Sequence, residues 1–185
     1  MARPSPDLRL TRPVVLVGLM GVGKTTVGRR LAQTLRVPFR DADAEIEAAA
    51  NMRIADIFGI YGEAAFRDGE RKVIERLMAE APHVLATGGG AFMNEETRAL
   101  VKAESTSVWL RASLDVLVKR TALRDTRPLL RNGDPREILG RLLKEREPTY
   151  ALADIAVDSA DGPHARTVER VLEALAAREE AGTAV

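Results

Sequence analysis

The segment Gly18-Leu19-Met20-Gly21-Val22-Gly23-Lys24-Thr25-Thr26 fits G-x-x-x-x-G-K-[ST], the pattern of the phosphate-binding loop, or P-loop. It follows Val14-Val15-Leu16-Val17, an apolar run typical of a buried parallel strand, and precedes a helical pattern from Thr25 to Leu35. Glycines let successive backbone N–H groups turn toward phosphate oxygens, and the start of a helix adds a positive dipole. The segment therefore predicts a nucleotide-phosphate site on a strand–loop–helix turn.

Each residue type in this segment has an expected task. Lys24 would reach the β- and γ-phosphates, and the Thr25 hydroxyl would take a place on Mg²⁺. The expected nucleotide contacts are Gly21, Val22, Gly23, Lys24, Thr25 and Thr26. The alternative is a glycine-rich turn with a chance lysine, which the flanking strand and helix patterns disfavour.

The composition narrows the class of protein. The chain has 185 residues, which fits one domain, and its 28 basic and 27 acidic residues give no global argument for nucleic acid or membrane binding. It has no cysteine, and two histidines, His83 and His164, make a histidine metal site improbable. No apolar run approaches the length of a transmembrane helix, and the first 12 residues lack the apolar region of a secretory signal. We expect a cytoplasmic location.

The rest of the chain alternates strand and helix patterns. Strands are predicted over 37–41, 83–87, 107–110 and 154–158. Helices are predicted over 43–50, 54–80 with breaks at Gly59 and Gly62, 94–103, 114–123, 136–147 ending at Pro148, and 168–179. Residues 124–135 are predicted to form a polar loop. This alternation predicts a doubly wound α/β fold with a parallel sheet, whose ligands bind at the carboxyl ends of the strands.

Two carboxylates follow the second predicted strand. Asp41 and Asp43 stand two residues apart, so in extended chain both side chains point to one side. Phosphoryl transfer uses such groups to hold Mg²⁺ and to orient the attacking hydroxyl. Aspartate is also a favoured helix N-cap, and a helical pattern begins here, so both interpretations stay open.

Three further features lie near a predicted strand end or on predicted helices. Gly88-Gly89-Gly90 suits close approach of the backbone to a ligand, with a flexible turn as the alternative. Arg67 lies three residues before Glu70, which taken alone is typical of a solvated helical face. Arg146 taken alone is typical of a surface residue.

A basic segment occupies residues 119–131. It carries Lys119, Arg120, Arg124, Arg127 and Arg131 beside Pro128. Guanidinium groups on a closing lid would stabilise a transferring phosphoryl group and exclude water. A solvated basic loop is the alternative.

Together these residues resemble the shikimate kinase family. Its motifs are matched, in order, by Gly18/Gly21/Gly23/Lys24/Thr25, Asp41/Asp43, Phe66/Arg67/Glu70, Gly88-Gly89-Gly90, Arg127-Pro128-Leu129-Leu130 and Arg146/Pro148/Tyr150. The match runs from about residue 14 to 158. The P-loop alone marks a superfamily, whereas the full set is specific to this family.

The resemblance implies a fold and a domain organisation. The fold is that of P-loop NTPases of the nucleoside-monophosphate-kinase type, with a five-stranded parallel sheet flanked by helices. One kinase domain would span residues 13–180, with a substrate-binding subdomain near 41–70 and a lid near 120–135. Residues 1–12 would form a disordered tail, and 181–185 a short second tail.

The resemblance also implies an activity, the ATP-dependent phosphorylation of shikimate to 3-phosphoshikimate in aromatic amino-acid biosynthesis. Asp43, Arg67 and Arg146, with the backbone of the glycine triplet, would hold shikimate, and Asp43 would accept from the attacking hydroxyl. Asp41 would help to order Mg²⁺. Lys24 and Arg127 would act on the γ-phosphate, and Arg120 would hold the adenine side. A monomer is expected.

Three alternatives remain open at this point. Gluconokinases share the fold and act on a hydroxy acid, whereas a nucleoside monophosphate kinase needs a second base site, for which this chain is poor in aromatics. A nucleotide-dependent switch is the alternative that is not an enzyme, but the chain lacks the N-K-x-D guanine motif. One departure from the family concerns the segment after Asp158, where the next arginine is Arg166, so adenine contacts there are not assigned.

Overall fold

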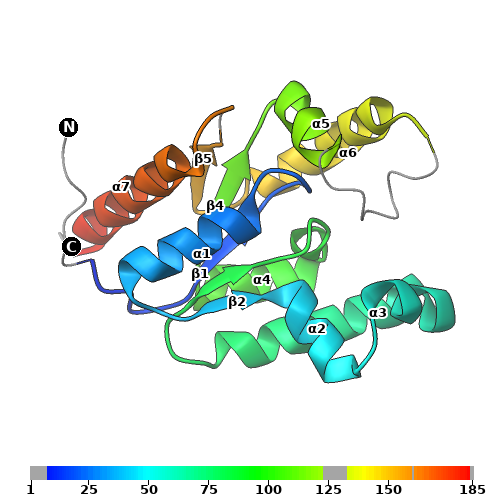
Figure 1. Cartoon of the computed structure of the whole chain (residues 1–185). Coiled ribbons are helices and arrows are strands. Elements are labelled where there is room, and N and C mark those ends of the chain that lie inside the picture. Colours follow the sequence, from blue (N-terminus) through cyan, green and yellow to red (C-terminus); the bar gives the residue numbers. More distant parts are fainter. Residues whose placement is uncertain (1–7, 123–132, 160, 184–185) are drawn as a thin grey trace.

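Five parallel strands form the centre of the molecule in the order β2-β3-β1-β4-β5 (Figure 1). The structure is a computed structural model that describes residues 8–122, 133–159 and 161–183. The strands are β1 Val14–Val17, β2 Phe39–Asp41, β3 Val84–Ala86, β4 Thr106–Arg111 and β5 Ile155–Asp158. The predicted fold class, with its five-stranded parallel sheet, is confirmed.

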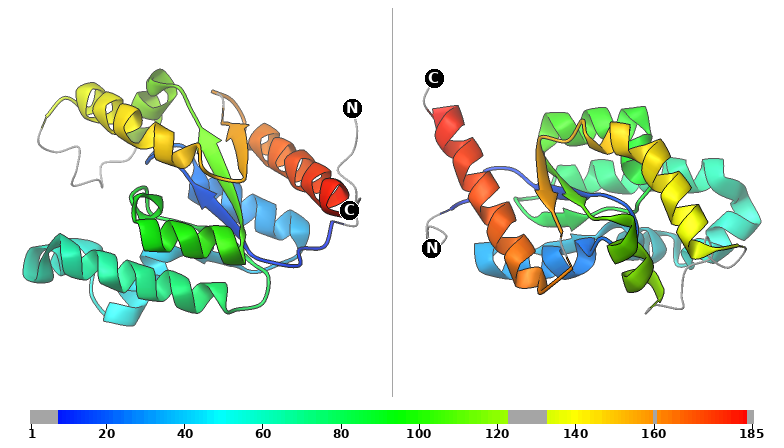
Figure 2. Two further views of the ribbon diagram at one scale, coloured as in Figure 1. Left: turned by 180° about the vertical axis from the view of Figure 1, so that it is seen from behind. Right: turned by 90° about the horizontal axis from the view of Figure 1, so that it is seen from above.

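Helices cover both faces of this sheet. They are α1 Lys24–Leu35, α2 Ala42–Ala50, α3 Ile54–Met78, the 3₁₀ turn η1 Ala91–Met93, α4 Glu95–Glu104, α5 Leu114–Ala122, α6 Pro135–Tyr150 and α7 His164–Thr183. Helices α1 and α7 pack together on one face, and α3 and α4 on the other (Figure 2). All four residues of β1 are buried, as expected for a central strand with helices on both sides.

Two helices differ from the predictions. The predicted break at Gly59 is wrong, whereas Gly62 has φ +82° and kinks α3. The prediction that a helix ends at Pro148 is also wrong, because α6 continues to Tyr150. A proline in the last turn removes one hydrogen bond only, and the Ala151 N–H still donates to Glu147 O over 2.9 Å.

The ordered chain extends further at both ends than expected. Leu8 and Leu10, which lie within the predicted tail, pack against the core, because apolar side chains two residues apart in extended chain can face the same side. Helix α7 begins at His164 rather than at 168 and reaches Thr183, beyond the predicted domain end at 180. Residues 1–7 lie outside the described part of the chain.

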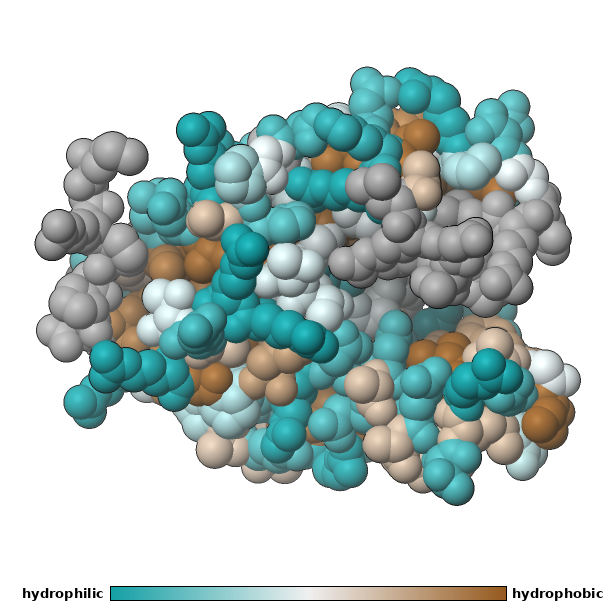
Figure 3. Space-filling view, viewed as in Figure 1, coloured by the Kyte–Doolittle hydropathy of each residue, from teal (hydrophilic) through white to brown (hydrophobic). Residues whose placement is uncertain are grey.

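The visible surface is mainly polar. Hydrophilic side chains cover most of the face in Figure 3, and hydrophobic residues form small separate patches between them. Within the described ranges, no helix has both the length and the apolar character needed to cross a bilayer.

Candidate active site

The P-loop connects β1 to α1 through backbone that requires glycine. Gly18, Gly21 and Gly23 have φ values of +139°, +82° and +102°, and a Cβ on Gly18 would lie 2.6 Å from the Leu110 carbonyl oxygen. Lys24 Nζ donates to the carbonyl oxygens of Gly18, over 2.7 Å, and of Leu19, over 3.2 Å. The ammonium group is therefore held above the loop that the sequence assigns to phosphate.

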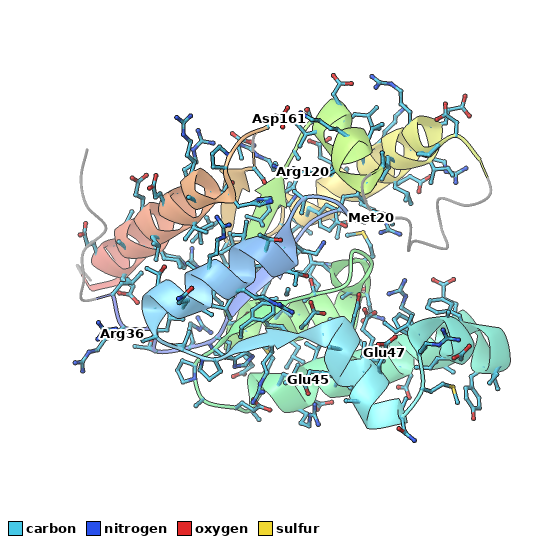
Figure 4. All side chains as sticks on the ribbon, viewed as in Figure 1. Met20, Arg36, Glu45, Glu47, Arg120 and Asp161 are labelled. Atoms are coloured by element: carbon cyan, nitrogen blue, oxygen red, sulfur yellow. The ribbon has the colours of Figure 1, made fainter. Side chains whose placement is uncertain are left out.

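A second cationic group reaches the P-loop from α5. Arg120 Nη1 donates to the Val22 carbonyl over 3.0 Å and to Ser159 Oγ over 3.1 Å. In Figure 4, Arg120 lies between Met20 of the P-loop and Asp161. Burial lowers the pKa of the Arg120 guanidinium, and Asp161 partly opposes this shift. Arginine remains protonated, so a fixed positive charge stands beside the loop.

The segment after β5 supplies contacts that the sequence analysis did not assign. Ser159 is buried, and its hydroxyl donates to the Val22 carbonyl over 3.0 Å. Cε1 of His164 lies 2.9 Å from the position that a Cβ on Gly23 would take. Neither contact follows from a sequence motif, because both depend on where β5 and α7 meet the P-loop.

Asp41 performs two tasks at the end of β2. Its Oδ1 accepts from the Asp43 backbone N–H over 3.2 Å and caps α2, whereas its Oδ2 accepts from the Thr25 hydroxyl over 3.0 Å. The interpretation of this aspartate as a helix N-cap is therefore confirmed. The same carboxylate also contacts the P-loop, and its expected role in ordering Mg²⁺ stays a prediction.

The donor set of Asp41 and Thr25 suits Mg²⁺. Both groups present oxygen, and Mg²⁺ usually takes one or two protein oxygens together with waters and substrate phosphates. Among the described residues no cluster of three or more histidine, cysteine or acidic side chains could hold a metal by itself.

The glycine triplet follows β3 at the same edge of the sheet as the P-loop, and charged side chains surround it. Asp43 Oδ1 and Glu70 Oε1 each lie 3.1 Å from the position of a Cβ on Gly88, and Arg67 Nη2 lies 2.6 Å from that of Gly90. Within the described part of the chain, the backbone N–H groups of the triplet have no hydrogen-bond acceptor. The triplet therefore offers close approach and backbone donors to a ligand.

Arg67 is held by a buried acid. Its Nη1 donates to Glu70 Oε2 over 2.7 Å, and the Glu70 side chain is only 2% exposed. Burial raises the pKa of the Glu70 carboxyl, Arg67 opposes this effect, and Asp43 adds to it. Glu70 Oε1 is buried and has no hydrogen-bond partner among the described residues. The solvated-face interpretation of Arg67 is therefore wrong, because its partner belongs to the interior.

Arg146 and Tyr150 reach the triplet from α6. Arg146 Nη1 donates to the Gly89 carbonyl over 3.0 Å, and the Tyr150 hydroxyl donates to the same oxygen. The surface interpretation of Arg146 is therefore wrong. The residue types of Glu70 and Tyr150 alone indicate no role at the site. Both nevertheless belong to motifs of the shikimate kinase family, Phe66/Arg67/Glu70 and Arg146/Pro148/Tyr150, and these motifs are the sequence signal that points to them.

The structure thus brings together the expected residues of both halves of the site, with one exception. Arg127 lies outside the described residues, together with Arg124, Arg131 and most of the predicted lid. What is assembled is a phosphate loop beside a glycine triplet that two guanidinium groups and two carboxylates surround. The backbone N–H groups of this triplet have no acceptor among the described residues. Such a set can bind a small acid and present its hydroxyl to a nucleotide.

Comparisons with known proteins agree with this arrangement. The family model for shikimate kinase matches residues 20–176. A shikimate kinase of Paramagnetospirillum magneticum is 59% identical over 177 residues, which cover 95% of this chain and 91% of the relative. The solved shikimate kinase of Acinetobacter baumannii, in complex with shikimate, superposes with a TM-score of 0.86 at 36% identity, covering 90% of this chain and 94% of that chain.

The similarity to a gluconokinase is weaker. The solved gluconokinase of Sinorhizobium meliloti gives a TM-score of 0.61 at 23% identity over 94% of this chain and 96% of that chain, which shows a shared fold alone. The family model and the relative from Paramagnetospirillum, in contrast, both extend over most of the residues that build the site. The chain belongs to the shikimate kinase family.

Proposed function

We propose that this chain transfers the γ-phosphoryl group of ATP to the 3-hydroxyl of shikimate, giving 3-phosphoshikimate and ADP in aromatic amino-acid biosynthesis. The chain is a kinase by family membership. The observation that carries the proposal is the convergence of Arg67, Arg146 and Asp43 on one glycine triplet beside the P-loop.

The half of the site formed by Asp43, Arg67, Arg146 and the glycine triplet, here called the acceptor half, suits a phosphate acceptor that is a carboxylic acid with hydroxyl groups. Arg67 and Arg146 approach the triplet from α3 and α6, and a guanidinium forks onto a carboxylate through two charge-assisted hydrogen bonds. The backbone N–H groups of Gly88, Gly89 and Gly90 add donors to the same region. Asp43 then accepts from the 3-hydroxyl and orients it, which is the main demand of a loose phosphoryl-transfer transition state.

The nucleotide half holds and polarises ATP. Backbone groups from Gly21 to Thr26 surround the phosphates, and Lys24 leaves its loop carbonyls to offset charge on the γ-phosphate. Arg120 contacts the adenine side from its place against Val22. Arg127 is expected to close over the γ-phosphate with the lid.

Thr25 and Asp41 would hold Mg²⁺, Thr25 directly and Asp41 through its ordered shell. When bound, the ion neutralises charge on the β- and γ-phosphates. The 3.0 Å hydrogen bond between these two side chains holds their oxygens together.

The test is a coupled ADP-release assay with Mg²⁺–ATP, in which shikimate, gluconate, quinate and AMP are compared as acceptors. Rapid turnover on shikimate alone is expected. ATP binding without turnover on shikimate would overturn the proposed substrate, and turnover on gluconate would move the assignment to the gluconokinases. ATP binding without any acceptor would support a nucleotide-dependent switch.

The proposal includes a cytoplasmic monomer that needs neither nucleic acid nor membrane. Nearly balanced charge, 28 basic against 27 acidic residues, supports the absence of a polyanion partner. Size-exclusion chromatography with light scattering tests the oligomeric state, and the mass of a dimer would contradict the proposed monomer.

A further inference from the structure

One backbone carbonyl in the acceptor half has two side-chain donors. The Gly89 oxygen accepts from Arg146 Nη1, over 3.0 Å, and from the Tyr150 hydroxyl. Both donors come from α6, four residues apart, and therefore from one side of that helix. A carbonyl oxygen has two lone pairs, so these donors use its full capacity.

Holding the Gly89 carbonyl oxygen in place also sets the direction of the Gly90 N–H. The described backbone has no cis peptide, so the Gly89–Gly90 unit is planar and trans, and the Gly90 N–H points opposite to the Gly89 carbonyl. That N–H has no acceptor among the described residues, and Gly90 lies against the Arg67 guanidinium. The direction of a free donor in the acid-binding region is thus set from α6.

We propose that Tyr150 is a positioning residue for the acceptor acid: its hydroxyl holds the Gly89 carbonyl, and thereby aims the Gly90 N–H at the carboxylate that Arg67 and Arg146 bind. This inference rests on the proposed function. Once the acid is bound, Arg146 has to serve both the carboxylate and the Gly89 oxygen, whereas Tyr150 serves the Gly89 oxygen alone. The hydroxyl therefore keeps the peptide unit in place while Arg146 turns to the substrate.

Burial and packing hold the Tyr150 side chain in place. Its ring is 1% exposed and stacks on Trp109 with centroids 6.1 Å apart, so the hydroxyl position does not depend on substrate. Burial raises the pKa of the Tyr150 hydroxyl, and Arg146 partly opposes the shift. The group therefore remains protonated, and a donor, at neutral pH.

The test uses Tyr150→Phe, which removes the hydroxyl and keeps the ring. Wild-type turnover on shikimate is measured first, followed by kcat, both KM values and shikimate binding by calorimetry. We expect the shikimate KM and Kd to rise about five- to tenfold, which is the size of one lost hydrogen bond. The ATP KM should stay within about twofold, because the nucleotide half does not contact this hydroxyl.

The chain offers a matched control. Its only other tyrosine, Tyr61, is 62% exposed, so Tyr61→Phe makes the same chemical change away from the Gly89 carbonyl and should not reproduce the selective rise in the shikimate KM. The fluorescence of Trp109, the one tryptophan in the sequence, should match wild type in Tyr150→Phe if the ring keeps its place. A merely structural role would alter this emission and the melting temperature rather than the shikimate KM alone.

A double-mutant cycle sharpens the result. Tyr150→Phe and Arg146→Lys act on one carbonyl, so their effects on shikimate binding should be non-additive. An unchanged shikimate KM, equal rises in both KM values, or full additivity would overturn the role of Tyr150. Absence of wild-type turnover on shikimate would instead overturn the proposed function, and the two failures are therefore distinguishable.

Discussion

The Thr25 hydroxyl donates to the Asp41 carboxylate over 3.0 Å, joining the first turn of α1 to the end of β2. The other oxygen of the same carboxylate caps α2, the first helix of the predicted substrate subdomain. One side chain thus connects the nucleotide loop with the element that carries Asp43. A change at Asp41 should affect both halves of the site.

The two tasks of Asp41 can be separated by substitution. Asp41→Asn keeps an oxygen for the cap but loses the charge, so the Mg²⁺ concentration for half-maximal rate should rise about tenfold with little loss of stability. Asp41→Ala should lose the cap as well, at a cost of about 1 kcal/mol in unfolding free energy. Magnesium titrations and urea unfolding measure both effects. Unaltered Mg²⁺ dependence in Asp41→Asn would leave the residue as a cap alone.

Lys24 is expected to act mainly on the transition state. Lys24→Ala should lower kcat by about 10²- to 10³-fold or more, since it removes a positive charge aimed at the transferring group. The fold should be retained, because the two carbonyls to which Lys24 donates, those of Gly18 and Leu19, belong to the same loop. Steady-state kinetics and thermal melting test this, with the exposed Lys144→Ala on α6 as control. Near-normal kcat would refute the P-loop assignment.

Arg146 should act on the acid rather than on the nucleotide. Arg146→Ala should raise the shikimate KM about 10- to 100-fold, the range for a lost hydrogen bond to a charged group, and leave the ATP KM nearly unchanged. Arg141→Ala is the matched control, because Arg141 lies on the same helix with its side chain 69% exposed. Equal rises in the two KM values would remove Arg146 from the acid site.

Gly90 offers a steric probe of Arg67. Its φ of −99° and ψ of −12° suit alanine, but a Cβ would lie 2.6 Å from Arg67 Nη2. Gly90→Ala should therefore displace the guanidinium and raise the shikimate KM at least about tenfold without unfolding the protein. Gly69→Ala on α3 is the control, since a Cβ there meets nothing within 4 Å. If Gly90→Ala and Gly69→Ala have the same shikimate KM, Arg67 does not bind the acid.

Glu70 should give stability a specific pH dependence. Its pKa is raised in the native state by burial, so the folded protein binds this proton more tightly than the unfolded chain. The resulting stability is full below about pH 4.3, the unfolded value, and is lost as pH rises through the native pKa, by about 1.4 kcal/mol for each pH unit of that interval.

Glu70→Gln removes this titration, so its unfolding free energy should gain on wild type as pH rises through the interval. Urea unfolding at a series of pH values measures the difference. Glu75→Gln, at an exposed position on the same helix, controls for the loss of one surface charge. A constant difference between Glu70→Gln and wild type would contradict the buried-acid account. Activity should fall as well, since Arg67 loses its charged partner.

Most of the architecture could be predicted from the sequence. The P-loop and the alternating patterns depend on local chemistry, and the structure has the five strands and the site-bearing loops where they were expected. What escaped prediction depends on long-range packing. Arg67 and Arg146 had the pattern of surface residues because the glycine triplet that faces them comes from a different part of the chain.

The end of α6 and the contacts that follow β5 could not be predicted from the sequence for the same reason. Pro148 is a local signal for a helix end, yet α6 continues to Tyr150, whose ring packs on Trp109 from β4. Ser159 and His164 follow the last strand without a motif, and their contact with the P-loop exists only once that strand joins the sheet. Chain topology, rather than residue type, creates these contacts.

The strand order has a consequence for how the protein is made. Strand β1 is the first to leave the ribosome, but its neighbours are β3 and β4, which begin only at Val84 and Thr106. A nascent chain that ends near residue 80 holds the whole P-loop motif, while both edges of an entirely apolar strand remain unpaired. Such a chain would be a client for chaperones rather than a nucleotide-binding fragment. The P-loop therefore becomes competent only after β4, which begins at Thr106, has emerged.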